Sequence, residues 1–93
     1  ERGEAKGQYN VGVMYDYGIG VPRDNEAAVK WYRLAAEQGF ADGQNGLGLM
    51  YSDGLGVPQD RKTAAKWYRL AAEQGNTEAQ SNLDWIVSRG TWK

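Results

Sequence analysis

The chain repeats itself with a period of 36 residues. When residues 3–38 are placed on residues 39–74, 22 of the 36 positions are identical. A third copy begins at Gly75 and covers about half a unit, so the units are residues 3–38, residues 39–74 and a partial unit at 75–93. Repeats of about 20–50 residues indicate stacked supersecondary units, each packed on its neighbours. We therefore expect a single domain made of two complete units and one partial unit.

Each unit contains two stretches in which small and apolar residues follow helical spacing. In the first stretch they occupy positions 5, 11, 12 and 15, with a recurring glutamine at position 8, and positions 41, 47, 48 and 51 of the next unit, with glutamine at position 44. In the second stretch they occupy positions 28, 31, 32, 35 and 36, and then 64, 67, 68, 71 and 72. Steps of three and four residues place each set on one helix face. The pattern predicts five helices of about 11–15 residues that pair into αα-hairpins, giving an all-α solenoid.

The motif G-x-G-V-P-x-D separates the two helices of each complete unit. Gly18 and Gly54 can adopt the left-handed conformation that ends a helix. Asp24 and Asp60 can then cap the N-terminus of the following helix, and Asn76 can do the same for the fifth helix. The motif therefore predicts a helix end followed closely by a helix start.

Composition excludes several classes of function. The chain has 11 Lys plus Arg against 12 Asp plus Glu, so it lacks the positive charge that neutralises phosphates, and we expect no nucleic-acid partner. It has no cysteine and no histidine, which removes disulfides, the common zinc sites and thiolate or imidazole catalysis, and no cofactor is implied. No run approaches about 18 apolar residues, so we expect no membrane insertion. The cellular compartment stays open, because a chain without thiols suits any of them.

The ends of the chain suggest a piece of a longer protein. The sequence begins at Glu1 instead of a methionine, and the third unit has a first helix without a second one. Repeat arrays usually end in helices with a polar outer surface. A first helix without a partner therefore indicates either a truncated array or self-association through that helix.

The signature L-G-x-x-Y-x-x-G-x-G-V-x-x-D occupies residues 47–60, and A-x-x-W-Y and A-A-E-Q-G follow at 64–68 and 71–75. This pattern resembles the Sel-1-like repeat family, which is related to the tetratricopeptide repeat, and the resemblance covers the whole chain. The third unit departs from it with Asp84 for glycine and Val87 for tyrosine. The resemblance implies a right-handed αα-superhelix that is a non-catalytic scaffold or adaptor for protein–protein interaction, often in bacterial systems.

Partner choice is expected in positions that differ between units and face the concave side, which the first helix of each unit lines in related repeats. We call these positions the strip. Its members are Tyr9, Val13, Asp16, Tyr17, Asn45, Leu49, Ser52, Asp53, Ser81, Trp85, Ser88 and Arg89. Aromatic and apolar residues with polar edges suit a bound peptide or helix. The alternative is that Val13, Leu49 and Trp85 pack successive first helices together.

Two other groups of residues invite a functional interpretation. Trp31, Tyr32, Trp67 and Tyr68 recur identically in both units, which favours core packing over a ligand site. Asp16 and Asp53 could form the carboxylate pair of a hydrolase, although an open stack offers no pocket that excludes water. We predict that the chain is not an enzyme and that it binds a protein or peptide on its concave face. Self-assembly, and more remotely a carboxylate hydrolase, are the alternatives.

Overall fold

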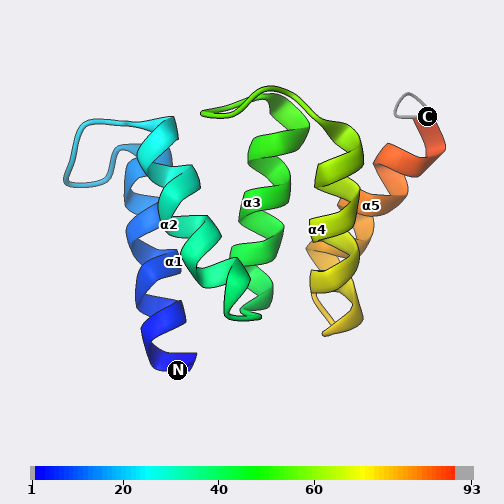
Figure 1. Ribbon diagram of the computed structural model, residues 1–93, viewed down its shortest axis with the longest axis horizontal. Helices are drawn as coiled ribbons and strands as arrows, with labels where there is room; N and C mark the ends of the chain where they lie inside the picture. The colour runs from blue at the N-terminus through cyan, green and yellow to red at the C-terminus, as the bar shows by residue number, and fades with distance from the viewer. Residues whose placement is uncertain (1, 90–93) are drawn as a thin grey trace.

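The computed structural model describes residues 2–89, and over this range the chain forms five α-helices and no strand. In chain order they are α1 (Arg2–Tyr17), α2 (Asn25–Glu37), α3 (Ala41–Asp53), α4 (Arg61–Glu73) and α5 (Thr77–Arg89), as Figure 1 shows. Successive helices run in opposite directions. The prediction of an all-α solenoid of αα-hairpins is confirmed. The last four residues of the expected third unit, 90–93, lie outside the described range.

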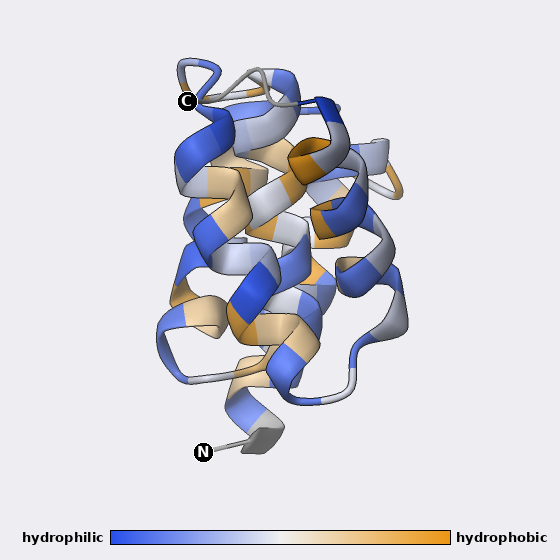
Figure 2. Ribbon diagram, turned by 90° about the vertical axis from the view of Figure 1, so that its right-hand side faces the viewer, coloured by the Kyte–Doolittle hydropathy of each residue, from blue (hydrophilic) through white to orange (hydrophobic). Residues whose placement is uncertain are grey.

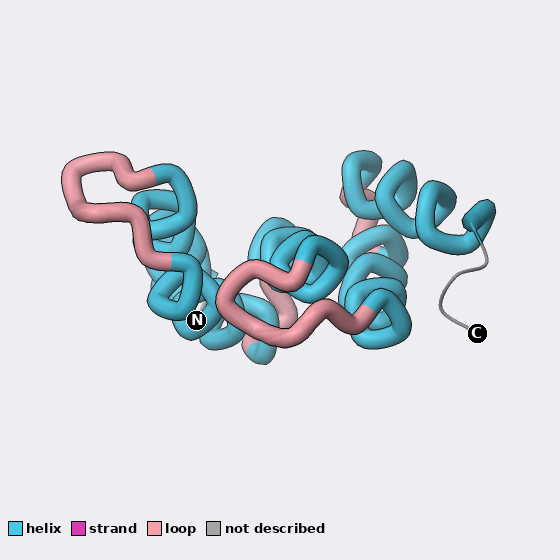
Figure 3. The backbone as a smooth tube through the Cα atoms, turned by 90° about the horizontal axis from the view of Figure 1, so that it is seen from above, coloured by secondary structure: helices cyan, strands magenta, loops and turns pink. Residues whose placement is uncertain are grey.

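The helices form a curved row. Each helix packs on the next one in the chain, and α1 also contacts α3. Seen from above, α1, α3 and α5 lie along one side of the row, and α2 and α4 lie along the other (Figure 3). The two ends of the row bend toward the first of these sides, so α1, α3 and α5 line the concave surface, which we call the inner face. The row measures 37 × 25 × 17 Å.

The predicted caps and helix ends are present. Asp24, Asp60 and Asn76 each accept a hydrogen bond from the backbone N–H three residues later, at distances of 3.1, 3.1 and 2.8 Å. Gly18 and Gly54 both have φ of 68°, in the left-handed region where glycine is favoured. The sharp reversals between paired helices therefore follow from the repeated loop motif.

The cap at Asp60 makes the stability of α4 depend on pH. Hydrogen bonds from the Thr63 side chain and backbone hold the pKa of the Asp60 carboxyl below its ordinary value of 3.8. A carboxyl whose pKa is lower in the folded state stabilises the fold above its ordinary pKa and loses this effect as pH falls through the lowered value. Between pH 6 and pH 2 we therefore expect the chain to lose more stability than the Asp60→Asn variant, whose amide oxygen still caps. Urea denaturation at both pH values measures the difference, and equal losses would contradict the assignment.

The core consists of two clusters, each of which joins the second helix of one unit to the first helix of the next. The first includes Val29, Tyr32, Leu47 and Met50. The second is built around Tyr68, with small residues of α4 and with Ala79 and Ile86 of α5. Hydrophilic and hydrophobic residues alternate along each helix in Figure 2, as expected for helices that bury one face. None of the helices in the described part of the chain is long and apolar enough to cross a membrane.

Glycines let the helices approach the two buried tyrosine rings. A Cβ atom at Gly12 would lie 2.6 Å from the ring of Tyr32, and one at Gly48 would lie 2.7 Å from the ring of Tyr68. Gly46, which has no glycine counterpart in the other units, would place its Cβ 3.2 Å from the Tyr32 ring on the opposite side from α1. The weak helix-forming residues of α3 are therefore a requirement of packing, since α3 lies between α2 and α4.

The two tryptophans of the second helices lie at the edge of the core, and Trp67 packs against the first core cluster. Trp31 and Trp67 are partly buried, whereas Val29 and Ala65 are buried instead. The buried stripe of α2 runs over positions 28, 29, 32, 35 and 36, so it is centred slightly away from position 31. The two tyrosines of these pairs are fully inside, as predicted.

Candidate functional site

All members of the strip lie on the three helices that line the inner face, but their exposure differs. Tyr17, Asp53, Ser81, Trp85, Ser88 and Arg89 are exposed, Tyr9, Val13, Asp16 and Leu49 are partly buried, and Asn45 and Ser52 are buried. Apart from Tyr17, at the end of α1, the exposed members lie on α5 and at the C-terminal end of α3. The structure therefore divides the strip into a packed part and an accessible part.

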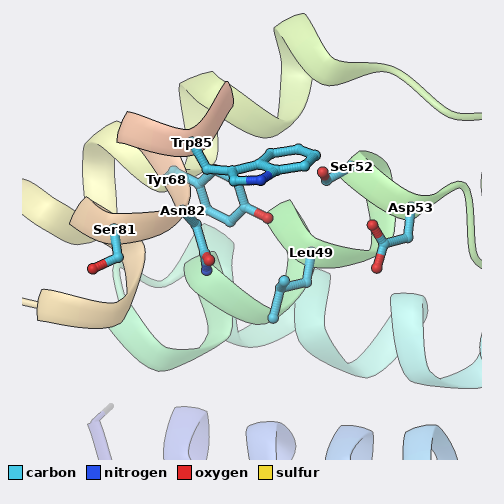
Figure 4. Close-up of a pocket in the computed structure, with 7 residues that line it drawn as sticks. All are labelled: Leu49, Ser52, Asp53, Tyr68, Ser81, Asn82 and Trp85. Atoms are coloured by element: carbon cyan, nitrogen blue, oxygen red, sulfur yellow. The ribbon is translucent and has the colours of Figure 1, made fainter. Parts of the chain in front are cut away.

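A pocket of about 390 Å³ opens at the accessible part of the strip. Its lining comes from three helices and comprises Leu49, Ser52 and Asp53 of α3, Tyr68 of α4, and Ser81, Asn82 and Trp85 of α5. In Figure 4 the indole of Trp85 lies above Tyr68, with Asp53 and Leu49 across the opening. The structure thus brings five members of the strip together around one hollow.

Trp85 forms an accessible apolar wall of this pocket. Its side chain is 45% exposed, which is unusual for so large an apolar group. The guanidinium carbons of Arg89 and Arg61 lie 4.1 and 5.3 Å from the centroid of its ring system. Such cation–π contacts contribute about 0.5–1 kcal/mol each at exposed sites. The two arginines therefore fix the orientation of the indole without closing the pocket, which neither of them lines.

Tyr68 forms the buried floor of the pocket. Burial raises the pKa of its hydroxyl to about 12; a hydrogen bond with the Ser52 side chain acts in the opposite direction, and the charges of Asp53 and Glu78 add to the rise. The hydroxyl is therefore protonated at any physiological pH. It serves as a neutral hydrogen-bonding group and not as an acid or base.

The equivalent positions of the first unit are arranged differently. Asp16, which corresponds to Ser52, accepts a hydrogen bond of 2.8 Å from the Tyr32 hydroxyl. Burial and this bond to a carboxylate strongly raise the pKa of Tyr32. Asp16 therefore satisfies a buried tyrosine, and we propose no acid–base role for it or for a pair with Asp53. In the second unit the carboxylate is that of Asp53, which stands one residue later in the repeat, at the position that corresponds to the exposed Tyr17.

On the inner face, the side chain of Tyr9 covers the first core cluster. The ring centroid of Tyr9 lies 5.7 Å from that of Tyr32 and 5.7 Å from that of Phe40. Tyr9 and Val13 both pack against the first core cluster. In this unit the alternative interpretation, that the strip packs helices together, describes the structure better than partner binding.

Asn45 joins α3 to α5 within the inner face. It is 6% exposed, and its side-chain oxygen accepts a hydrogen bond of 3.0 Å from Asn82. Asn82 occupies the position of Gly46 in the preceding unit, so an amide replaces a bare backbone beside the second buried tyrosine. We assign Asn45 to this interhelical contact instead of the partner surface.

Sequence reasoning missed three contributors to the site. Tyr68 was expected only in the core, and Asn82 and Arg61 were not singled out. Tyr68 belongs to the core and also lines the pocket. Because the first unit has a tyrosine at the same position, the sequence gives no sign of this second role. No repeat signal singles out Asn82, because asparagine also stands at the equivalent position 10 and the exception among the three units is Gly46.

The outer side of α5 differs from that of α1 and α3. Asp84 stands at the position of Gly12 and Gly48, and it accepts a hydrogen bond of 3.0 Å from Gln80. Each of those glycines is packed against a buried tyrosine, Gly12 against Tyr32 and Gly48 against Tyr68. The charged side chain of Asp84 is incompatible with the same contact, so α5 presents a polar surface on this side, interrupted by the exposed Val87.

The geometry defines the class of protein as an α-helical repeat protein built from αα-hairpins. Residues 5–40 and 41–76 each match the Sel1 repeat family. The chain therefore belongs to the Sel1 repeat family, which confirms the resemblance seen in the sequence. No curated protein matches the sequence.

Three solved structures illustrate the similarity. A Sel1 repeat protein from Oxalobacter formigenes matches with a TM-score of 0.88 and 42% identity over 92% of this chain and 35% of that one. The protein c5321, a protective antigen present in uropathogenic Escherichia coli strains that displays an SLR fold, matches with a TM-score of 0.90 and 48% identity, over 92% and 18%. Helicobacter pylori cysteine rich protein B matches with a TM-score of 0.79 and 29% identity, over 85% and 59%. The chain spans about a third or less of the first two proteins and somewhat more than half of the third.

Sel1 repeat proteins act in general as modules for protein–protein interaction, and the family is one of repeat scaffolds, not of catalysts.

Proposed function

We propose that this chain binds a protein or peptide segment on its inner face, at the surface that Leu49 and Trp85 form beside the pocket. The observation that carries the proposal is the exposed indole of Trp85, held in place at the rim of a hollow on the concave side. Rigid aromatic groups beside a pocket are typical of residues that dominate binding energy at interfaces. These positions also differ between units, whereas the residues that build the fold are shared.

Replacing Leu49 and Trp85 together by alanine is expected to weaken peptide binding at least about tenfold, the effect typical of losing interface anchors. The probes are peptides selected from a random 12-residue display library on the unaltered chain. The matched control replaces Leu34 and Leu70, two exposed leucines of α2 and α4, and is expected to change affinity less than about twofold. Fluorescence anisotropy of labelled peptides gives the dissociation constants, and circular dichroism verifies that the variants fold.

Peptides whose affinity depends on Leu34 and Leu70, and not on Leu49 and Trp85, would reject the inner face as the binding surface. We leave Tyr9 out of the variant, because its ring packs against Tyr32 and Phe40 and its loss would disturb the fold. Leu49 also packs against the second core cluster, so the single variant Trp85→Ala is measured beside the double variant.

Self-association through α5 remains the second candidate function. The exposed Val87 on the outer side of α5 favours it, and the neighbouring Asp84 and Gln80 oppose it. Burial of an unpaired carboxylate in an interface is costly. Binding of a different protein on the inner face therefore has the stronger support.

A further inference from the structure

The pocket has one charged lining residue, and that residue is a carboxylate. Of the seven lining side chains, Leu49, Tyr68 and Trp85 supply apolar surface, and Asp53 alone carries a charge. Asp53 is exposed at the last position of α3, at the negative end of the helix dipole. The pocket therefore combines apolar walls with a negative rim.

The Asp53 carboxylate is available to a ligand. Within the described part of the chain no side chain donates a hydrogen bond to it or forms an ion pair with it. In the first unit, by contrast, the Tyr32 hydroxyl donates to Asp16. In the second unit Ser52 takes the position facing the buried tyrosine, and the carboxylate stands one residue further along, at the rim. The two units thus differ in that one carboxylate serves the fold and the other faces solvent.

The surroundings of the pocket are also negative on the side of Tyr68. Asp53 and Glu78 both act on Tyr68 in the direction that raises its pKa. The nearby cations Arg61 and Arg89 lie against the indole of Trp85, and neither belongs to the lining. A long side chain that enters the pocket would meet hydrocarbon and ring surface first and then a carboxylate.

We propose that the pocket receives a lysine or arginine side chain of a bound protein segment, with the aliphatic part of that side chain against Leu49 and Trp85 and its cationic group at Asp53. This inference rests on the proposed function and specifies the chemistry of the partner. Lysine and arginine suit the site because they bury an apolar stem while they keep the charge at the surface. The open, hydrated rim leaves the carboxylate–cation contact modest in strength and sensitive to salt.

The test uses three nine-residue glycine/serine peptides that differ only at the central position, which is lysine, norleucine or glutamate. Each is titrated into the ¹⁵N-labelled chain, and NMR shifts of Leu49, Asp53 and Trp85 give the dissociation constants. We expect the lysine peptide to bind up to about fivefold more tightly than the norleucine peptide, as an exposed ion pair allows, and the glutamate peptide to bind most weakly. The advantage of lysine is expected to shrink at high salt.

Two substitutions assign the effect to the carboxylate. Asp53→Asn is expected to abolish the difference between the lysine and norleucine peptides. Asp84→Asn removes the same charge next to Trp85 in sequence, but Asp84 does not line the pocket, so this variant should keep the difference. Trp85→Ala is expected to weaken both peptides, since both use the apolar wall.

Several outcomes would overturn the proposal. These are equal affinity for the lysine and norleucine peptides, an advantage of lysine that survives Asp53→Asn, tighter binding of the glutamate peptide, and no shift at the pocket with any of the three. Failure here is distinguishable from failure of the proposed function. Library-selected peptides that need Leu49 and Trp85 but show no preference for lysine or arginine would uphold inner-face binding and reject the cationic partner.

Discussion

Replacing Tyr68 with alanine is expected to lower the free energy of unfolding by about 3–5 kcal/mol, the usual cost of removing a large buried aromatic side chain. Tyr68 is 1% exposed and is one of the largest fully buried side chains. Its ring packs on Gly48 and belongs to the same cluster as Ile86, so its loss leaves a cavity between α3, α4 and α5. Guanidinium denaturation followed by far-UV circular dichroism measures the change.

Tyr68→Phe provides the matched control for this prediction. Phenylalanine keeps the ring and removes only the hydroxyl, so the expected loss is about 1 kcal/mol, the net value of one hydrogen bond. If the alanine variant were as stable as the phenylalanine variant, the ring would not be the centre of the second core cluster, and the fold described above would be wrong at this point.

Replacing Gly48 with alanine is expected to lower the free energy of unfolding by about 1–3 kcal/mol, the range found when a packed core must accept an extra group. The new Cβ would lie 2.7 Å from two ring carbons of Tyr68 and 3.3 Å from the backbone oxygen of Ala64. Both neighbours are buried and cannot move aside cheaply. The loss is expected although alanine is the better helix former by about 1 kcal/mol. The thermal midpoint should fall by roughly 4–8 °C per kcal/mol, as measured by a circular dichroism melt.

Gly7→Ala is the control for this substitution. No heavy atom lies within 4 Å of a Cβ at Gly7, so this variant should be unchanged or more stable by up to about 1 kcal/mol. In the Tyr68→Ala background the cost of Gly48→Ala should shrink, because the atoms that collide are gone. Equal destabilisation by Gly7→Ala and Gly48→Ala would show that contact with Tyr68 is not the cause.

The sequence determines most of the fold because the repeat fixes the period, and the loop motif fixes the helix ends. Asp24 and Asp60 cap as expected, and Gly18 and Gly54 take the left-handed conformation. The partial burial of Trp31 could not be predicted, because helical spacing defines the buried stripe only to within about one position. The role of Gly46 also needed the structure, since it depends on a tyrosine ring that arrives from the preceding helix.

The candidate site was predicted in part. Leu49, Asp53 and Trp85 were on the strip, and the structure brings them to one pocket. Sequence alone could not show that Asn45 is buried against Asn82, because the curvature of the row decides which positions of α3 meet α5. Nor could it show that Asp16 is engaged by Tyr32, since the contact joins residues of two helices through a side-chain hydroxyl.

The position of the pocket links binding to the integrity of the chain's last helix. Asn82 and Trp85 belong to α5, which packs on α4 and reaches α3 through side chains such as Asn82. If α5 detaches from α4, three of the seven lining residues, Ser81, Asn82 and Trp85, leave with it. A bound segment would therefore stabilise the state in which α5 is packed on α4, and amide exchange throughout α5 would become slower.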